Sequence, residues 1–296
     1  MQLVFENPIA LDTLLRVAKD EVHGFEIETA VQDSVFIEGF SSLNHARQNF
    51  LSFCSASELP STFNVKGAIV IVNHKVLVPE AVEKNTTLVK TSNPRLMFIK
   101  LVVDILKSIN EEELFTNYES TSVIYGKDCL IKPGAVIGQA GFGYERDRDG
   151  TPIRFPHFGS VVLGNHVEVG ANTVISKGVL EDTVIRDCTK IDDLVYIAHN
   201  CKIGKNVMIA GNATLCGGVQ VGDGAWIGAG ASIKQNVKVG EGAVVGLGAV
   251  VVKDVAAYSM VVGNPARAID DQAQDEKEQV HLAQQKRQEQ QTQGAA

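Results

Sequence analysis

The feature of the sequence that most constrains its fold is an aliphatic residue that recurs at every sixth position between residues 185 and 251. Twelve consecutive positions six apart are Ile, Leu or Val: Ile185, Ile191, Ile197, Ile203, Ile209, Leu215, Val221, Ile227, Ile233, Val239, Val245 and Val251. A small residue follows many of these anchors, as in Ile203-Gly204 and Val221-Gly222. A helix needs a period of 3.6 and a half-buried strand a period of 2, so neither explains the pattern. A strict period of six predicts a parallel β-helix of hexapeptide repeats.

In such a β-helix each hexad forms one short strand and three hexads close a triangular coil. We expect coils about 4.8 Å apart, as between strands of a sheet, with the aliphatic anchors inside. Glycine is expected where the chain turns a corner and a Cβ would clash or φ must be positive. Earlier steps of six begin at Tyr125 and resume at Leu163. Together they indicate about 18 hexads in roughly six coils.

The repeat is interrupted by an expected projecting loop over residues 139–157. This loop contains Gly141-Phe142-Gly143-Tyr144 and a charged run over residues 145–149. Loops of this length project from one face of a solenoid and usually serve binding.

The first 118 residues lack the repeat and predict a small α/β domain, which is a candidate nucleotide-binding domain. Helical spacing occurs over 10–19, and strands are expected over 25–28 and 67–72. A helix is expected from Pro94 to Leu106, with proline in the first turn where its missing N–H does no harm. The predicted β-helix domain covers 119–267. The polar segment 268–296 is expected to be an exposed helix or disordered.

Charge and composition exclude several classes of partner. The net charge is −8, which argues against nucleic acid as the main partner. No apolar run approaches the ~20 residues of a membrane span, and no basic stretch precedes an apolar run at the N-terminus. The five scattered cysteines are typical of reduced thiols, so we expect a cytoplasmic protein without membrane insertion. Flat-faced β-helices of this size favour a closed homotrimer with active sites between neighbours.

His199 is the first candidate for chemistry, two positions after the anchor Ile197. A neutral imidazole in a cleft can take a proton from an amine or a hydroxyl, although His199 could also be a surface histidine without a role. Gly217 follows one coil later and should stack beside His199. Its N–H could stabilise an oxyanion. Alternatively, the glycine is needed only for the chain to turn a corner of the coil. Asp192 and Asp193 could orient the imidazole or be solvated.

Two other histidines, His157 and His166, flank the end of the projecting loop. They lack the spacing of zinc ligands, so we expect no metal site.

Four segments resemble motifs of UDP-3-O-acyl-glucosamine N-acyltransferases, the lipid A enzymes among the left-handed β-helix acyltransferases. They are Gly141-Phe142-Gly143-Tyr144, Ile197-Ala198-His199-Asn200, Leu51-Ser52-Phe53 and Ser92-Asn93-Pro94. The resemblance covers most of the chain. It implies a trimer of left-handed β-helices, each with an N-terminal α/β domain that binds uridine.

The resemblance also implies roles for individual residues. His199 would be the general base that deprotonates a sugar amine as the amine attacks a thioester, and the Gly217 N–H would face the oxyanion. Phe53 would stack on the nucleobase. The substrate-binding residues would further include Phe142, Gly143 and Tyr144 of the sugar loop, and Asp193 and Asn200 of the catalytic segment.

The segment from Val261 to Arg267 resembles a different relative. Its Asn264-Pro265-Ala266-Arg267 is similar to the ending of coenzyme A-dependent sugar acetyltransferases. In those enzymes an Arg or a nearby Lys often meets the phosphates of CoA. The candidates here are Arg267, Lys234 and Lys253, which could otherwise be plain surface charges.

The sequence therefore predicts an N-acetyltransferase that uses acetyl-CoA and a nucleotide-linked amino sugar, more readily UDP- than dTDP-linked. Its product would serve O-antigen or another lipopolysaccharide or surface polysaccharide. One alternative is a lipid A acyltransferase that uses an acyl carrier protein. The other is a non-catalytic trimeric scaffold.

Overall fold

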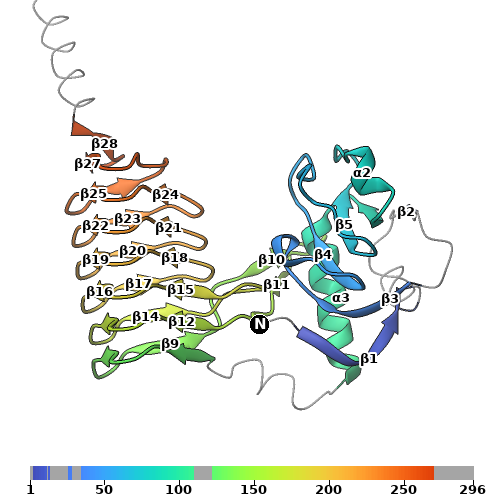
Figure 1. The fold of residues 1–296 in the computed structure, drawn as a ribbon, viewed down its shortest axis with the longest axis horizontal. Coiled ribbons are helices and arrows are strands. Elements are labelled where there is room, and N and C mark those ends of the chain that lie inside the picture. Colours follow the sequence, from blue (N-terminus) through green and yellow to red (C-terminus); the bar gives the residue numbers. More distant parts are fainter. Residues whose placement is uncertain (1–2, 12, 14–25, 29–34, 110–121, 270–296) are drawn as a thin grey trace, which may run out of the picture. The chain divides into compact units, whose positions relative to one another are not determined.

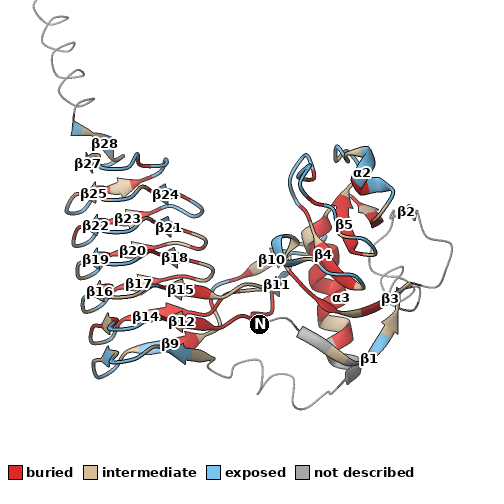
Figure 2. Cartoon of the chain, in the orientation of Figure 1, coloured by how far each residue is buried: buried red, intermediate tan, exposed pale blue. Residues whose placement is uncertain are grey.

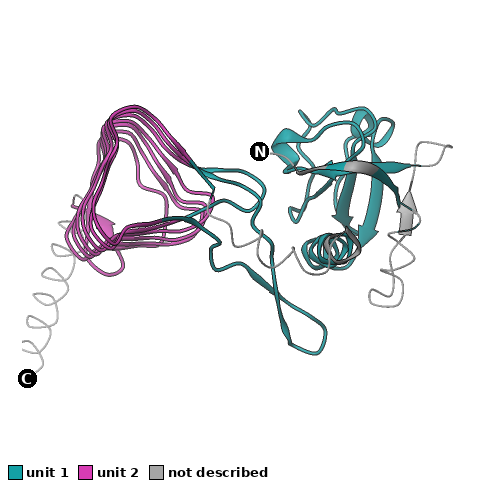
Figure 3. Ribbon diagram, turned by 90° about the horizontal axis from the view of Figure 1, so that it is seen from below, with its two compact units in different colours: residues 1–123, 137–161, 176–183 teal, residues 124–136, 162–175, 184–296 magenta. Residues whose placement is uncertain are grey.

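The computed structural model describes residues 3–11, 13, 26–28, 35–109 and 122–269. Two compact units are present (Figure 3): unit 1 comprises residues 1–123, 137–161 and 176–183, and unit 2 comprises residues 124–136, 162–175 and 184–296. The expected domain boundary near residue 118, the tail from 270 and most of the helical pattern over 10–19 lie outside the described residues. Ala10 itself is the last residue of a strand.

Unit 1 is built on a mixed six-stranded sheet with the order β1-β3-β4-β5-β6-β2 (Figure 1). Its strands are β1 (Leu3–Ala10), β2 (Glu26–Glu28), β3 (Phe36–Phe40), β4 (Phe50–Phe53), β5 (Ile69–Asn73) and β6 (Thr87–Thr91). The four central strands are parallel, and the edge strands β1 and β2 are antiparallel to their neighbours. The helices are η1 (Leu43–His45), α2 (Glu80–Glu83) and α3 (Pro94–Ile109).

The central strand β5 is buried on both faces, which explains its unbroken apolar run. Ile69 and Ile71 belong to a core cluster with Phe98 of α3, whereas Val70 belongs to a second cluster with Val82 of α2. Figure 2 shows the buried strands and α3 in red. The expected strand over 67–72 and the helix that begins at Pro94 are thus confirmed.

The hexads form the strands of three long sheets in a β-helix (Figures 1 and 3). The first sheet contains β7 (Val123–Tyr125), β12 (Val161–Leu163), β15 (Thr183–Ile185), β18 (Lys202–Ile203), β21 (Gln220–Val221) and β24 (Lys238–Val239). The second contains β8 (Leu130–Ile131), β13 (Glu168–Val169), β16 (Lys190–Ile191), β19 (Met208–Ile209), β22 (Trp226–Ile227), β25 (Val244–Val245), β27 (Met260–Val262) and β28 (Arg267–Ala268). The third contains β9 (Val136–Gln139), β14 (Val174–Ser176), β17 (Tyr196–Ile197), β20 (Thr214–Leu215), β23 (Ser232–Ile233) and β26 (Val250–Val251).

From Ile185 to Ile233 every anchor residue is buried inside the coils and pairs with the anchor 18 residues later. Ile197 pairs in parallel with Leu215, and Leu215 pairs with Ile233. All three side chains are fully buried. The predicted fold class, a mostly β protein with a parallel β-helix of hexapeptide repeats preceded by an α/β region, is confirmed.

The small residues of the hexad have two separate causes. Gly222, directly after an anchor, has a negative φ, but a Cβ there would lie 2.5 Å from the backbone nitrogen of Glu241 in the next coil. The positive φ values fall two positions later, for example at Asn200 (62°) and Gly218 (72°). Asn and Gly are the residues that tolerate this left-handed conformation best.

The interruption after the first coil contains an antiparallel hairpin. β10 (Tyr144–Arg146) pairs with β11 (Pro152–Arg154) inside the expected projecting loop. Because of this insertion Leu130 pairs with Glu168, 38 residues later instead of 18. The anchor Tyr125 is 55% exposed, since β7 is the terminal strand of its sheet.

Among the described residues, no helix is long and apolar enough to span a membrane.

Candidate active site

His199 lies two residues after the end of β17, where the chain leaves one side of the coil. Its imidazole is partly buried, and Nδ1 lies 3.0 Å from Oδ1 of Asn200. An amide oxygen can only accept a hydrogen bond, so this contact favours the neutral tautomer that carries its hydrogen on Nδ1. This arrangement suits Nε2 to act as a proton acceptor.

Gly217 lies against the His199 ring in the following coil. A Cβ on Gly217 would lie 2.7 Å from Cε1 and 2.9 Å from Nε2 of the imidazole. The next residue, Gly218, donates its N–H to the His199 carbonyl at 2.9 Å. The 18-residue spacing therefore places Gly217 beside His199, and only glycine leaves room for the ring.

Some N–H groups at this place in the hexad donate to a carboxylate, and others, as at Gln235, have no acceptor among the described residues. Lys205 N donates to Asp223 Oδ1 at 2.8 Å, and Gly211 N donates to Asp192 Oδ2 at 3.1 Å. Among the residues that the structure describes, nothing accepts a hydrogen bond from Gly217 N. A donor of this kind beside an imidazole can stabilise negative charge on a reacting oxygen.

Asp193 is engaged elsewhere in its coil. Its Oδ1 accepts hydrogen bonds from Lys132 Nζ at 2.9 Å and from Ala171 N at 2.7 Å. The Lys132 ammonium, followed by the Ala171 N–H, holds the pKa of this carboxyl below its usual range. The neighbouring Asp192 accepts from Gly211. In the structure it is therefore Asn200 that contacts the imidazole, and the substrate-binding role of Asp193 stays a prediction.

A pocket at the C-terminal end of the coil stack contains two of the three predicted cofactor residues. Its volume is about 670 Å³, and its lining includes Val251, Lys253, Pro265 and Arg267. Lys253 lies two positions after its anchor, as His199 and Gly217 do, and the intervening anchors pair in register. The third candidate, Lys234, is exposed and does not line this pocket.

Lys253 thus stands on the same column of the coil stack as His199, three coils further along. At about 4.8 Å for each coil, the two residues are separated by about 14 Å along the axis. A ligand with one end at His199 and an anionic group at Lys253 must therefore have a long arm.

The sugar-loop residues lie at the start of the hairpin in unit 1. Phe142 is 81% exposed, and its ring centroid lies 5.0 Å from that of Tyr144. The guanidinium of Arg154 lies over the Tyr144 ring at 5.3 Å. Gly143 is buried, and a Cβ there would lie 2.7 Å from Cε1 of His157. The loop presents two aromatic rings and one cation on a single surface.

Phe53, predicted to stack on a nucleobase, packs within an aromatic cluster of unit 1. Its ring centroid lies 4.9 Å from Phe98 and 6.0 Å from Phe155. It remains partly exposed, so one part of the residue is open to a ligand.

Sequence reasoning missed the residues that hold the hairpin, and it missed Arg154. The alternation of Ile153 and Phe155 with Arg154 is a strand signal that could have revealed the two faces of the hairpin. His157 is buried with Nδ1 2.8 Å from the Phe155 carbonyl, and His166 faces Asp128 at 3.7 Å. The described part of the chain contains no group of three or more His, Cys, Asp or Glu side chains that could hold a metal ion.

Comparison with known proteins supports the repeat assignment. Residues 182–217 and 218–253 each match the bacterial transferase hexapeptide family of six repeats. Over 148 residues, half of this chain, the sequence is 50% identical to UDP-3-O-acylglucosamine N-acyltransferase 2 of Legionella pneumophila, of which it covers 43%. It is 47% identical over 102 residues to UDP-3-O-acylglucosamine N-acyltransferase of Coxiella burnetii, covering 34% of this chain and 29% of that protein. The resemblance is confirmed over these lengths, and the chain spans less than half of each relative.

Two solved structures align with part of this chain at low TM-scores. UDP-N-acetylglucosamine acyltransferase from Campylobacter jejuni aligns with a TM-score of 0.41 and 28% identity, covering 50% of this chain and 63% of that one. PerB from Caulobacter crescentus, solved with CoA and GDP-perosamine, aligns with a TM-score of 0.34 and 21% identity, covering 68% of this chain and 84% of that one.

Proposed function

We propose that this chain, which carries the bacterial transferase hexapeptide repeat on a parallel β-helix, is an N-acyltransferase acting on the amine of a nucleotide-linked amino sugar. The acyl donor is acetyl-CoA. The observation that carries the proposal is the arrangement of the His199 ring between Asn200 Oδ1 and Gly217. It supplies a proton acceptor and an oxyanion donor at the same place.

The reaction follows from these two groups. The neutral amine attacks the thioester carbonyl carbon, and its proton passes to Nε2 of His199. The carbonyl oxygen becomes an oxyanion that accepts a hydrogen bond from Gly217 N–H. The carbon–sulfur bond then breaks, and the imidazolium returns its proton to the leaving thiolate. The products are an amide and free CoA, so protons and electrons balance.

The position of Lys253 and Arg267 supports CoA as the donor. Lys253 stands about 14 Å along the axis from His199, on the column that also carries Gly217, and Arg267 lines the same pocket as Lys253. An anionic group held there and a thioester held at His199 require a long flexible arm between them. CoA has such an arm and ends in phosphates. Lys234 contributes at most through its charge near this column.

The acceptor site is proposed to use the aromatic loop of the hairpin. Phe142, Gly143 and Tyr144 bind the sugar, and Phe53 offers an aromatic surface for the base. Asp193 remains a candidate for the catalytic segment. We further propose a cytoplasmic homotrimer that supplies O-antigen or another surface polysaccharide.

A second function is favoured by one observation. Two relatives that are 50% and 47% identical over the matched lengths are named UDP-3-O-acylglucosamine N-acyltransferases. Under this alternative the chain transfers a longer acyl group from an acyl carrier protein in the lipid A pathway. The chemistry at His199 is the same, and the donor differs.

The test is thiol release from acetyl-CoA by the purified protein with a panel of UDP- and dTDP-linked amino sugars. We expect release with at least one sugar nucleotide and a mass increase of one acetyl group on that sugar. Release from acyl carrier protein thioesters alone would replace this proposal with the lipid A alternative. A protein that transfers from neither donor and binds no sugar nucleotide would be a scaffold, and the proposal would be wrong.

A further inference from the structure

The hairpin β10–β11 has one face turned to helix α3 and one face turned away from it. Glu145, Asp147, Ile153 and Phe155 contact or pack toward α3, whereas Tyr144 and Arg154 form a pair on the opposite face. Side chains alternate between the two faces of a strand, so one face can be anchored while the other is presented. The anchored face determines where the sugar-loop residues lie.

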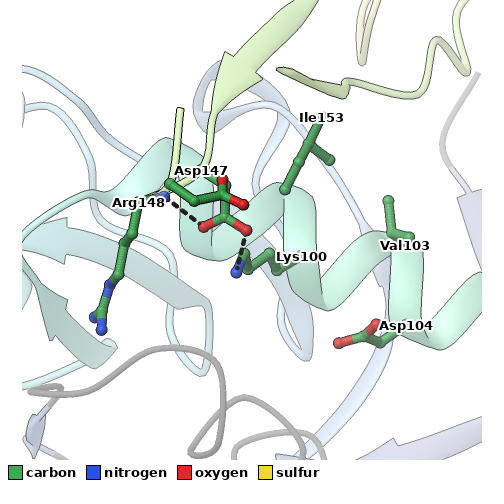
Figure 4. A pocket seen from close by; sticks show the side chains of 7 residues that line it. Lys100, Val103, Asp104, Asp147, Arg148 and Ile153 are labelled. Carbon is green, nitrogen blue, oxygen red and sulfur yellow. Dashed lines mark hydrogen bonds and ion pairs between the residues drawn. The ribbon is translucent and has the colours of Figure 1, made fainter. Parts of the chain in front are cut away.

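A nearly buried ion pair fixes the hairpin to the helix. Lys100 of α3 has only 9% of its side chain exposed, and its Nζ lies 2.9 Å from Oδ2 of Asp147 (Figure 4). Asp147 Oδ1 also accepts the N–H of Arg148 at 2.7 Å. The Lys100 ammonium, followed by this N–H, lowers the pKa of the Asp147 carboxyl. A buried ammonium is stable only with such a partner, so the hairpin has one favoured position.

Two further contacts align the hairpin along the helix. Arg95, five residues before Lys100 on α3, lies 3.3 Å from Glu145 and stacks over Phe155 at 5.5 Å. The Phe155 ring also packs against Phe98 at 6.0 Å. Glu145 on β10 and Asp147, the first residue after β10, are two apart along the chain, and both pair with basic side chains of α3. The contacts hold both the lateral position and the register of the hairpin.

The hairpin in turn holds the sugar loop through its backbone. Phe155 N donates to Gly143 O at 2.8 Å, and Asp147 N donates to Thr151 O at 2.9 Å. A displacement of Asp147 therefore displaces Tyr144 and its neighbours. Small displacements of binding groups have large effects on the reactions that they support.

We propose that Lys100 is a positioning residue for the acceptor: its ion pair with Asp147 holds the Phe142–Tyr144 loop in the conformation that binds the sugar nucleotide. The proposal rests on the proposed function for the identity of the ligand. Lys100 lies on α3, outside the Phe142–Tyr144 loop, and its proposed effect on the sugar passes through Asp147 and the hairpin.

The experiment combines hydrogen exchange with steady-state kinetics for Lys100→Met. We expect faster exchange of the amides over residues 143–155, and a KM for the sugar nucleotide raised about tenfold. The KM for acetyl-CoA and kcat should stay within about twofold, because the chemical step is untouched. Lys100→Arg retains the charge and should restore most of the sugar KM. Asp147→Asn provides a second route to the same loss if Lys100→Met folds poorly.

The matched control is Lys84→Met, which removes the exposed ion pair with Glu80 in the same unit. It should change neither exchange in the hairpin nor the sugar KM. Unchanged exchange in Lys100→Met, or faster exchange with an unchanged sugar KM, would contradict the proposal. A wild-type protein inactive with every donor would refute the proposed function, and the exchange data together with direct binding of UDP would still decide the role of Lys100.

Discussion

The coil stack of unit 2 and the α/β sheet of unit 1 are both built on parallel strands, yet they are specified in different ways. In the uninterrupted part of the stack, from Ile185 to Ile233, each anchor meets the equivalent residue 18 positions away, as Ile197 meets Leu215. In unit 1 the core joins distant segments, as when Phe155 of the hairpin packs against Phe53 and Phe98. A repeat encodes its own contacts, whereas a non-repeating core depends on which surfaces happen to meet.

The largest expected effects are on stability and differ between these regions. Leu215→Ala and Ile233→Ala should each cost about 2–5 kcal/mol of unfolding free energy, and the two costs should be similar because the sites are equivalent. Phe98→Ala should cost about 3–5 kcal/mol, and Phe53→Ala clearly less because its ring is partly exposed. Urea unfolding followed by circular dichroism measures all four. Unequal costs in the stack, or equal costs at the two phenylalanines, would break the comparison.

Gly217→Ala tests whether the repeat places the reactive groups. The new Cβ would lie 2.7 Å from the His199 ring, so the imidazole must move. We expect kcat to fall about 10²-fold with little loss of stability. Gly211→Ala is the matched control, since its Cβ meets only Asp192 and Asp193 atoms, at 3.2 Å or more. Equal kinetics for the two variants would remove Gly217 from the mechanism.

Arg267→Met tests the pocket that Arg267 lines together with Lys253. Loss of one charge-assisted hydrogen bond should raise the KM for acetyl-CoA about tenfold and leave kcat nearly unchanged. Lys238→Met removes an exposed cation from another sheet of the stack and serves as the control. A tenfold change in both variants would indicate general electrostatic attraction instead of a phosphate site.

The smallest expected effect concerns pH and the exposed Lys132–Asp193 pair. The pKa of Asp193 is lowered in the folded protein, chiefly by Lys132, so the pair adds stability above the ordinary pKa of about 3.9. This stability is lost as pH falls through the lower, folded value. The Tm difference between wild type and Lys132→Met should therefore be small at pH 7 and shrink toward pH 3. A difference that grows in acid would contradict this account.

The sequence predicts unit 2 in more detail than unit 1 for a physical reason. The period of six identifies the anchors. Since one coil has 18 residues, Gly217 is expected one coil after His199, and Lys253 two coils after Gly217. No repeat spacing predicts the contact between Lys100 and Asp147, because it depends on how the hairpin packs against α3. The sequence also does not show why each hexad glycine is needed. Gly222 allows the close approach of the next coil, whereas Gly218 adopts a positive φ.

The most direct test of the account is the turnover of His199→Ala, measured as thiol release with the best sugar nucleotide and acetyl-CoA. Loss of the general base should lower kcat about 10²–10⁴-fold, while the circular dichroism spectrum stays unchanged. His166→Ala, an exposed histidine elsewhere in the stack, should retain wild-type turnover. A His199→Ala variant that turns over at the wild-type rate would contradict the mechanism.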